Sequence, residues 1–223
     1  MRKTILILLF TLALMVVFSF STLAETPQDF KKWKEGENLV ENSSFEQDID
    51  AWSLEDGACC NRGGLYQWEI DKKNPQLGEQ SLKVIGVKAT GTDWHAKIRH
   101  ESTSMRAGKQ YTVAFWARSE KPRAVSLSIQ MQHDPWTFYQ GGEFQLAGPD
   151  WAEYTLTFNA EADVDRDMWV GLAIAQSDVD FWVDSFRFFE GELKDEIVEE
   201  GAPKAVDPKA KLSTTWSDIK SQF

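Results

Sequence analysis

One stretch constrains the fold more than any other: apolar and polar side chains alternate through most of residues 110–132. From Tyr111 the apolar residues recur at every second position, and after a turn at 120–123 the same period resumes. A period of two is that of a β-strand, so we predict two strands joined as an antiparallel hairpin. One face of the hairpin is apolar and must pack on a second sheet, whereas the other is polar and open.

Short alternating runs of the same kind, separated by turn residues, occupy most of residues 37–190. One of them starts at Trp94 and continues through Ala96 and Ile98, and the last, from Phe181 to Phe189, is expected to close the core. Roughly ten short strands without a helical stripe indicate an all-β protein. The predicted fold is a two-sheet antiparallel jelly-roll β-sandwich.

The first 24 residues have the pattern of a secretory signal peptide. Arg2 and Lys3 precede an apolar run at 5–20, and small residues follow it up to Ala24. An uncleaved membrane anchor is the alternative, for which the run is short. We therefore expect a secreted, extracytoplasmic protein without membrane attachment after cleavage.

The remaining chain divides into four parts. Residues 25–36 form a polar leader, 37–190 the sandwich and 191–211 a charged linker. In residues 212–223, Leu212, Trp216, Ile219 and Phe223 share one helical stripe, which predicts a short amphipathic helical tail. We expect this tail to pack back on the domain or to fray in solvent. The alternative is that it docks to a protein partner.

The net charge of the protein excludes some classes of partner. The formal charge of −11 over 223 residues is unfavourable for binding nucleic acid or anionic membranes.

The two cysteines of the chain, Cys59 and Cys60, are adjacent. Consecutive Cα atoms lie about 3.8 Å apart, so a disulfide bond between them would be strained. Free thiols and a vicinal disulfide in an oxidising compartment both stay open.

Aromatic side chains are the first candidates for ligand binding, because flat rings stack on the C–H faces of sugars. Trp68 and Trp94 lie in runs otherwise rich in polar residues, and Trp136 and Tyr139 follow a loop that could form an aromatic wall. The alternative for each is packing, since aromatic residues also dominate protein cores.

Polar side chains that match vicinal hydroxyls are the second group of candidates. Gln130 and Gln132 lie on the polar face of the predicted hairpin, and Arg99 and His133 are close to it in sequence. We expect this face and residues 94–101 to form a groove. The alternative for Arg99 and His133 is a role as solvent-exposed strand charges.

Patterns typical of catalysis are missing from the sequence, and we predict that the protein is not an enzyme. There is no Gly-x-Ser-x-Gly motif, and the three histidines lack metal-ligand spacing. The run Asp163-Val-Asp165-Arg-Asp167 begins like a calcium loop, but Met168 occupies the place of the required glycine.

Several motifs, taken in order, resemble a known family. They are Asn38-Leu39-Val40-Glu41-Asn42 with Phe45-Glu46 and Trp52, residues 78–84, residues 107–118, Trp151-Ala152-Glu153-Tyr154, and Phe181-Trp182-Val183-Asp184-Ser185-Phe186. Their order and spacing resemble carbohydrate-binding modules of families 4 and 9, with family 22 as a relative, among the galactose-binding-like β-sandwiches. The resemblance covers about residues 37–190.

This resemblance implies a non-catalytic module whose concave sheet holds a polysaccharide chain. It also implies a structural, non-catalytic Ca²⁺ ion with Glu46 and Asp184 as side-chain ligands, completed by main-chain carbonyls. Members place an arginine and a later polar residue at positions that Arg99 and His133 match approximately. The expected function is secreted, non-catalytic binding of a polysaccharide or glycan. The alternatives are a cell-surface interaction protein on the same scaffold, or a small glycan hydrolase or lyase.

Overall fold

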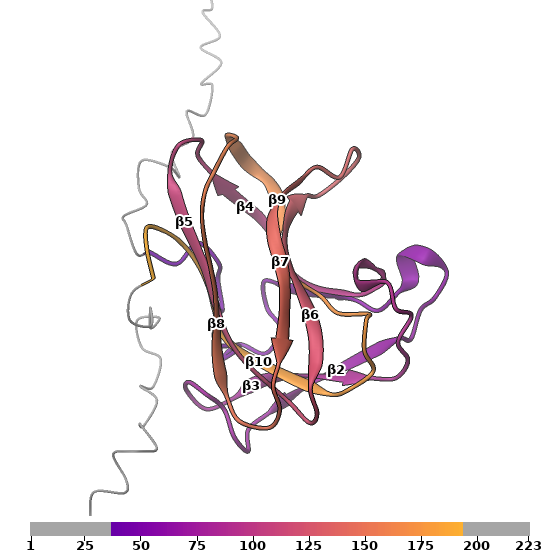
Figure 1. Ribbon diagram of the computed structural model, residues 1–223. Coiled ribbons are helices and arrows are strands. Elements are labelled where there is room, and N and C mark those ends of the chain that lie inside the picture. Colours follow the sequence, from indigo (N-terminus) through magenta and orange to yellow (C-terminus); the bar gives the residue numbers. More distant parts are fainter. Residues whose placement is uncertain (1–36, 194–223) are drawn as a thin grey trace, which may run out of the picture.

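The structure is a computed structural model, which describes residues 37–193 (Figure 1). The predicted signal peptide, leader and helical tail, and most of the predicted linker, lie outside the described residues. Ten strands and two short 3₁₀ helices make up the described part, so the all-β prediction is confirmed. They are β1 (Trp52–Glu55), η1 (Ala58–Cys60), β2 (Tyr66–Asp71), β3 (Ser81–Gly86), η2 (Asp93–His95), β4 (Lys97–Met105), β5 (Gln110–Ser119), β6 (Arg123–Met131), β7 (Phe138–Leu146), β8 (Ala152–Asn159), β9 (Val164–Ala173) and β10 (Phe181–Glu190).

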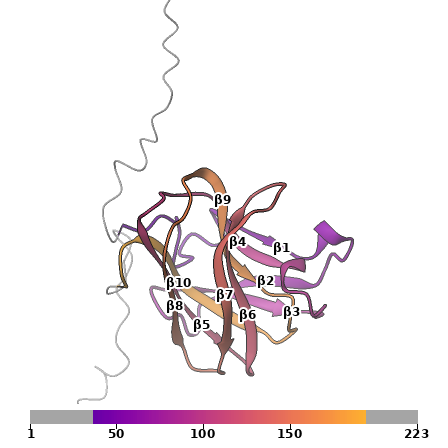
Figure 2. The same ribbon diagram turned by 45° about the horizontal axis from the view of Figure 1, so that its top comes forward.

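The strands form two five-stranded antiparallel sheets that face each other (Figures 1 and 2). The β4 sheet has the order β1-β4-β9-β6-β7, and the β10 sheet has the order β2-β3-β10-β5-β8. Pairing is nested: β6 pairs with β7, β5 with β8, β4 with β9 and β3 with β10. This nesting is the jelly roll that the sequence predicts, extended by β1 and β2 at the sheet edges.

The predicted hairpin of residues 110–132 is wrong. Both strands exist with their apolar faces inward, but β5 lies in the β10 sheet and β6 in the β4 sheet. Their apolar faces therefore meet across the sandwich instead of lying side by side. The other face of β5 is not open as predicted, because Thr112 and Ala114 are fully buried. The connection between β5 and β6 is fixed by the buried side chain of Arg123, whose guanidinium donates to the carbonyls of Val179 (2.6 Å) and Ile174 (2.7 Å).

The core lies between the two inner faces. The Phe115 ring of β5 stacks on Phe186 of β10 (5.6 Å between centroids) and meets Phe144 of β7 edge-on (5.6 Å). Burial of Arg123 at the rim of this core lowers its pKa to about 10. No helix within residues 37–193 has the length and apolar character needed to cross a membrane.

Candidate functional site

The outward face of the β4 sheet carries polar side chains in rows that cross its strands. Ile98, Leu127 and Val170 point into the core, so their strand neighbours point outward. Two rows cross all five strands in register. They are Ser53–Arg99–Gly171–Ser128–Gly141 and Glu55–Lys97–Ala173–Ser126–Glu143.

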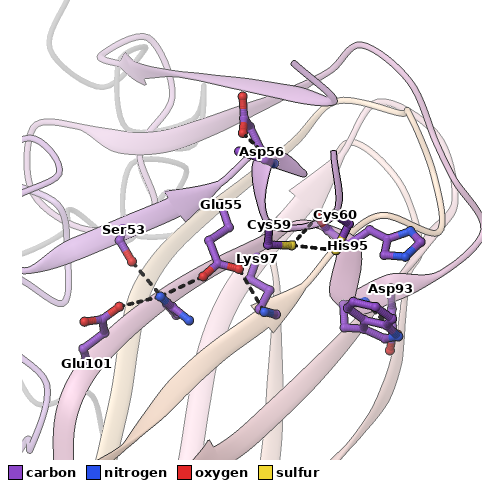
Figure 3. A network of polar contacts seen from close by, with 12 residues as sticks. Ser53, Glu55, Asp56, Cys59, Cys60, Asp93, His95, Lys97 and Glu101 are labelled. Atoms are coloured by element: carbon purple, nitrogen blue, oxygen red, sulfur yellow. Dashed lines mark hydrogen bonds and ion pairs between the residues drawn. The ribbon is translucent and has the colours of Figure 1, made fainter. Parts of the chain in front are cut away.

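A network of charges holds the polar groups at the β1–β4 edge of this face (Figure 3). Glu55 contacts Lys97 Nζ (2.9 Å) and Arg99 Nη2 (2.7 Å), and Glu101 contacts the same Nη2 (2.7 Å). Ser53 Oγ accepts a longer bond from Arg99 Nε (3.4 Å). The guanidinium of Arg99 is thereby held by three side chains before any ligand arrives.

The outward residues of β9 and β6 in these two rows are small. Gly171 and Gly141 are required by close backbone approach: a Cβ would collide with the carbonyl of Ile98 in the first case and of Leu127 in the second. The next row, Trp169–Gln130–Phe138, is bulky. The face thus combines charged groups, small residues on its middle strands and an aromatic border.

Exposed aromatic rings stand at the two ends of the face. Trp94 is 51 % exposed and Trp136 50 %. Trp94 does not lie on a strand as predicted: it belongs to η2, just before β4 begins. Its ring meets His95 edge-on at 4.4 Å. Trp136 lies in the β6–β7 connection, which projects beyond the sheet (Figure 2). The strand rise predicts roughly 26 Å between the two ends of β4, which runs from Lys97 to Met105.

Three predicted hydrogen-bonding residues position the β6–β7 connection. Gln130 Nε2 donates to the carbonyl of Trp136 (2.7 Å), and Gln132 Oε1 accepts from the backbone N–H of Ser102 (2.5 Å). His133 Nε2 lies 3.1 Å from Asp167 Oδ2. The structure therefore brings Gln130, Gln132 and His133 together with Trp136. Each glutamine already uses one polar atom within the protein, and His133 uses both ring nitrogens.

Two of the predicted aromatic residues are placed elsewhere. Trp68 lies on β2 of the opposite sheet, in register with the buried Val84 and Phe181, so it does not share the outward face of the β4 sheet. Tyr139 lies at a register shift in β7 and packs partly against the core. Burial, and then the charge of Asp167, raise the pKa of Tyr139.

The two predicted metal ligands are brought to one turn although 138 positions separate them in sequence. Glu46 Oε1 accepts from the N–H groups of Glu79 (2.9 Å) and Gln80 (3.2 Å). Asp184 Oδ2 accepts from those of Gln76 (2.8 Å) and Leu77 (2.9 Å). Burial raises the pKa of Asp184 to about 8, and the nearby charge of Glu46 adds to the shift.

Other candidate chemistry is sparse in the described part of the chain. Within residues 37–193 no three His, Cys, Asp or Glu side chains gather as a metal-binding group. Cys59 and Cys60 are free thiols with sulfur atoms 2.8 Å apart, in the η1 loop beside His95 (Figure 3). Burial and the hydrogen bond with Cys60 raise the pKa of Cys59 to about 11, so it is a weak nucleophile at neutral pH.

Fold and site together define a jelly-roll β-sandwich with one open, polar and aromatic-bordered sheet face, a class of binding domain. The chain belongs to the carbohydrate binding domain family that joins families 4 and 9, whose profile matches residues 37–170. This membership, expected from the motifs, supports a carbohydrate-binding role. No curated protein matches the sequence significantly.

Solved structures with the same fold include carbohydrate-binding modules. A family 4 module is 19 % identical (TM-score 0.56; 68 % of this chain and 99 % of that one). The family 22 xylan-binding domain of Paenibacillus barcinonensis Xyn10C is 14 % identical (TM-score 0.51; 72 % and 99 %). An arabinose-bound α-L-arabinofuranosidase is 12 % identical (TM-score 0.55), and the match covers 70 % of this chain but 27 % of that one.

Sequence reasoning missed several residues of this face. Trp169 belongs to it although only 1 % of the side chain is exposed, and Lys97 Nζ lies 5.8 Å from the Trp169 ring centroid. Phe138 is the most exposed of the large apolar side chains within residues 37–193. Alternation within β9 places Trp169 opposite the buried Val170, a signal that the sequence contains. The sequence does not reveal the register shift that turns Phe138 outward.

Proposed function

We propose that the protein binds a neutral polysaccharide or glycan chain, non-covalently and without catalysis, along the outward face of the β4 sheet. The observation that carries this proposal is the Arg99 cluster: Glu55, Glu101 and Ser53 fix the guanidinium on an outward face flanked by the exposed Trp94 and Trp136. Groups fixed beforehand lose little conformational entropy when a ligand binds.

The chemistry of the face suits a neutral sugar chain. Half-exposed indole rings offer flat apolar surfaces, and carboxylates, amides and the guanidinium offer partners for hydroxyl groups. Outward carboxylates (Glu55, Glu101 and Glu143) outnumber the outward cations Lys97 and Arg99, which disfavours a polyanion on this face. Affinity should be micromolar or weaker, because the ligand hydroxyls lose water to form each bond.

Affinity electrophoresis through gels containing neutral polysaccharides tests the proposal. Trp94→Ala and Gln130→Ala should each abolish or strongly reduce retardation of the wild-type protein. Trp68→Ala is the matched control, because it removes a half-exposed tryptophan from the opposite sheet and should leave retardation unchanged. Equal losses in Trp68→Ala and Trp94→Ala would contradict the assignment of the binding face.

Affinity electrophoresis together with a reducing-sugar assay separates the proposed function from its two alternatives. An interaction protein that retains the scaffold without its ligand would show no retardation on any polysaccharide. A small hydrolase or lyase would release new chain ends during incubation, which a reducing-sugar assay detects. We expect retardation without release.

We also propose that a structural Ca²⁺ ion is held by Glu46 and Asp184 with main-chain carbonyls. The donor set fits: two carboxylates meet at one turn, burial and mutual repulsion raise the pKa of Asp184, and a bound cation would supply the compensating charge. Gly78 closes the turn against Glu46, where a Cβ would collide with the carboxylate.

Thermal unfolding tests the calcium proposal. If CaCl₂ is present at 100 times its dissociation constant, binding adds about 2.7 kcal/mol of stability over the same protein in EDTA. Asp184→Asn should lose this difference, whereas Asp150→Asn, which changes an exposed turn residue, should keep it. Equal melting temperatures of the wild type in CaCl₂ and EDTA would contradict the proposal.

We further propose that the domain acts outside the cytoplasm after removal of residues 1–24. The support is the charged start, apolar run and small-residue end of that segment. The mass of the exported protein should correspond to a chain that begins at Glu25.

A further inference from the structure

A cavity of about 560 Å³ lies at the end of the sandwich that carries η1. It is lined by residues 61–65, which follow η1, and by residues 87–90, which follow β3. The carbonyl of Leu65 accepts from the N–H groups of Val87 (2.9 Å) and Lys88 (3.1 Å), which joins the two segments. None of the lining residues belongs to the rows on the outward face of the β4 sheet.

The charged residues that line this cavity are both positive, in a protein whose net charge is −11. They are Arg62 and Lys88, and neither forms an ion pair among the salt bridges of the described residues. The neighbouring carboxylate of Asp56 accepts from the N–H groups of Ala58 (3.2 Å) and Gly64 (2.8 Å). Asp56 therefore shapes the loop without pairing with the two cations in these contacts.

The guanidinium of Arg62 is held in place from one side. Its Nη1 lies 3.3 Å from Nδ1 of the buried His95, which also contacts Thr90 Oγ1 (3.0 Å). His95 is the last residue of η2 and lies beside the η1 loop, as Figure 3 shows. Its ring meets that of Trp94 at 4.4 Å, so one imidazole separates Arg62 from an exposed indole. A fixed planar fork suits a carboxylate, which has two oxygens in one plane.

We propose that this cavity is a second site, which binds the carboxylate of a uronic acid unit. Arg62 and Lys88 pair with the carboxylate, and Asn61, Thr90 and the backbone around Gly63 face the hydroxyl groups of the sugar. The inference rests on the proposed function for its class of ligand, a sugar, but not for its position. The cavity would bind acidic sugar units, which the outward carboxylates of the β4 sheet disfavour.

NMR titration of the wild-type protein with D-glucuronate and D-glucose tests the site, because the two sugars differ only at C6. We expect glucuronate to shift the amide signals of Gly63, Gly64 and Lys88, with a weaker effect as NaCl is added, and glucose to leave them unchanged. Inorganic phosphate and glucose 6-sulfate form two further arms. Glucuronate should bind at least 3-fold more tightly than either. Equal or tighter binding of phosphate or sulfate would overturn the assignment to a uronic acid.

The double variant Arg62→Gln/Lys88→Gln should weaken glucuronate binding at least 10-fold. Lys121→Gln, which removes an exposed charge from the β5–β6 connection, is the control and should bind as the wild type does. If the double variant has a lower melting temperature than the wild type, Lys88→Gln alone replaces it. This single variant should bind glucuronate at least 3-fold more weakly than the wild type. The proposal would be overturned if the double variant bound glucuronate as tightly as the wild type, or if glucose shifted the same amide signals of the wild type as much as glucuronate does. Retardation by neutral polysaccharides should persist in the double variant, so this site and the β4 sheet can fail independently.

Discussion

The outward faces of the two sheets have similar side chains but different exposure. On the β10 sheet, Trp182 is 8 % exposed, its Nε1 donates to Asp71 (2.7 Å) and the Arg118 guanidinium lies 3.8 Å from its ring centroid. On the β4 sheet, Trp94 and Trp136 border the face half-exposed. Both faces therefore hold a largely buried arginine (side chain 17 % exposed for Arg99 and 11 % for Arg118), and they differ in the half-exposed tryptophans that stand at the ends of the β4 sheet.

Residue type alone therefore does not identify a binding face. Arg118 and Arg99 both contact carboxylates, Asp71 in one case and Glu55 with Glu101 in the other. Arg118, however, also lies against the rings of Trp182 and Trp151, which occupy the space that a ligand would need. Accessible aromatic surface beside the fixed cation is what separates the candidate binding face from the packed one.

The largest effect should come from the packed face. Trp182→Ala should lower the free energy of unfolding by about 3 kcal/mol, because it removes a large buried ring and leaves Arg118 and Asp71 without their partner. That corresponds to a melting temperature roughly 10 °C lower. Calorimetry measures the loss. The glycan affinity of the folded protein should not change. If Trp182→Ala lost glycan binding while its stability stayed that of the wild type, the outward face of the β10 sheet, and not that of the β4 sheet, would be the binding face.

The next effect should appear in binding instead of stability. Trp136→Ala should weaken polysaccharide affinity about 10-fold, or about 1.4 kcal/mol, because it removes an exposed stacking surface. Stability should change by less than about 0.5 kcal/mol. Isothermal titration calorimetry and thermal melts measure the two quantities. Trp136→Phe is the control and should retain part of the affinity, and a loss as large as that of Trp136→Ala would argue against ring stacking.

The smallest effect concerns pH. Hydrogen bonding to the carbonyl of Asp134, and then the charge of Asp167, raise the pKa of the exposed His133 above its ordinary value of 6.5. Because the folded-state pKa is raised, the ion pair contributes fully below the unfolded pKa and is lost as pH rises through the folded value. The imidazole NMR signal should titrate above 6.5, and Asp167→Asn should lower its midpoint. An unchanged midpoint would exclude the ion pair.

Much of the fold follows from alternation within single strands. The inward residues of β5 and β6, such as Val113, Phe115 and Leu127, are buried as predicted. What alternation does not contain is the neighbour of each strand. In this jelly roll β5 and β6 are adjacent in sequence but belong to different sheets, so a turn-like connection was mistaken for a hairpin.

The candidate site could be predicted only in part for the same reason. Gln130, Gln132, His133 and Trp136 come from one continuous segment, and the structure keeps them together. The polar neighbours of Trp68 predict that it belongs to the same site, but its strand lies in the other sheet. Local composition reports how polar a strand is, whereas membership of a face depends on pairing between distant strands.

Alternation along the chain was enough to predict the inward side chains of most strands, and motif order was enough to predict the family. Which strands share a sheet, which tryptophans remain accessible, and the approach of Glu46 and Asp184 to one turn follow only from the three-dimensional arrangement. The two kinds of information differ in how far apart along the chain the interacting residues lie. Side-chain alternation is a property of neighbouring residues, but pairing and exposure depend on contacts between segments far apart in the chain.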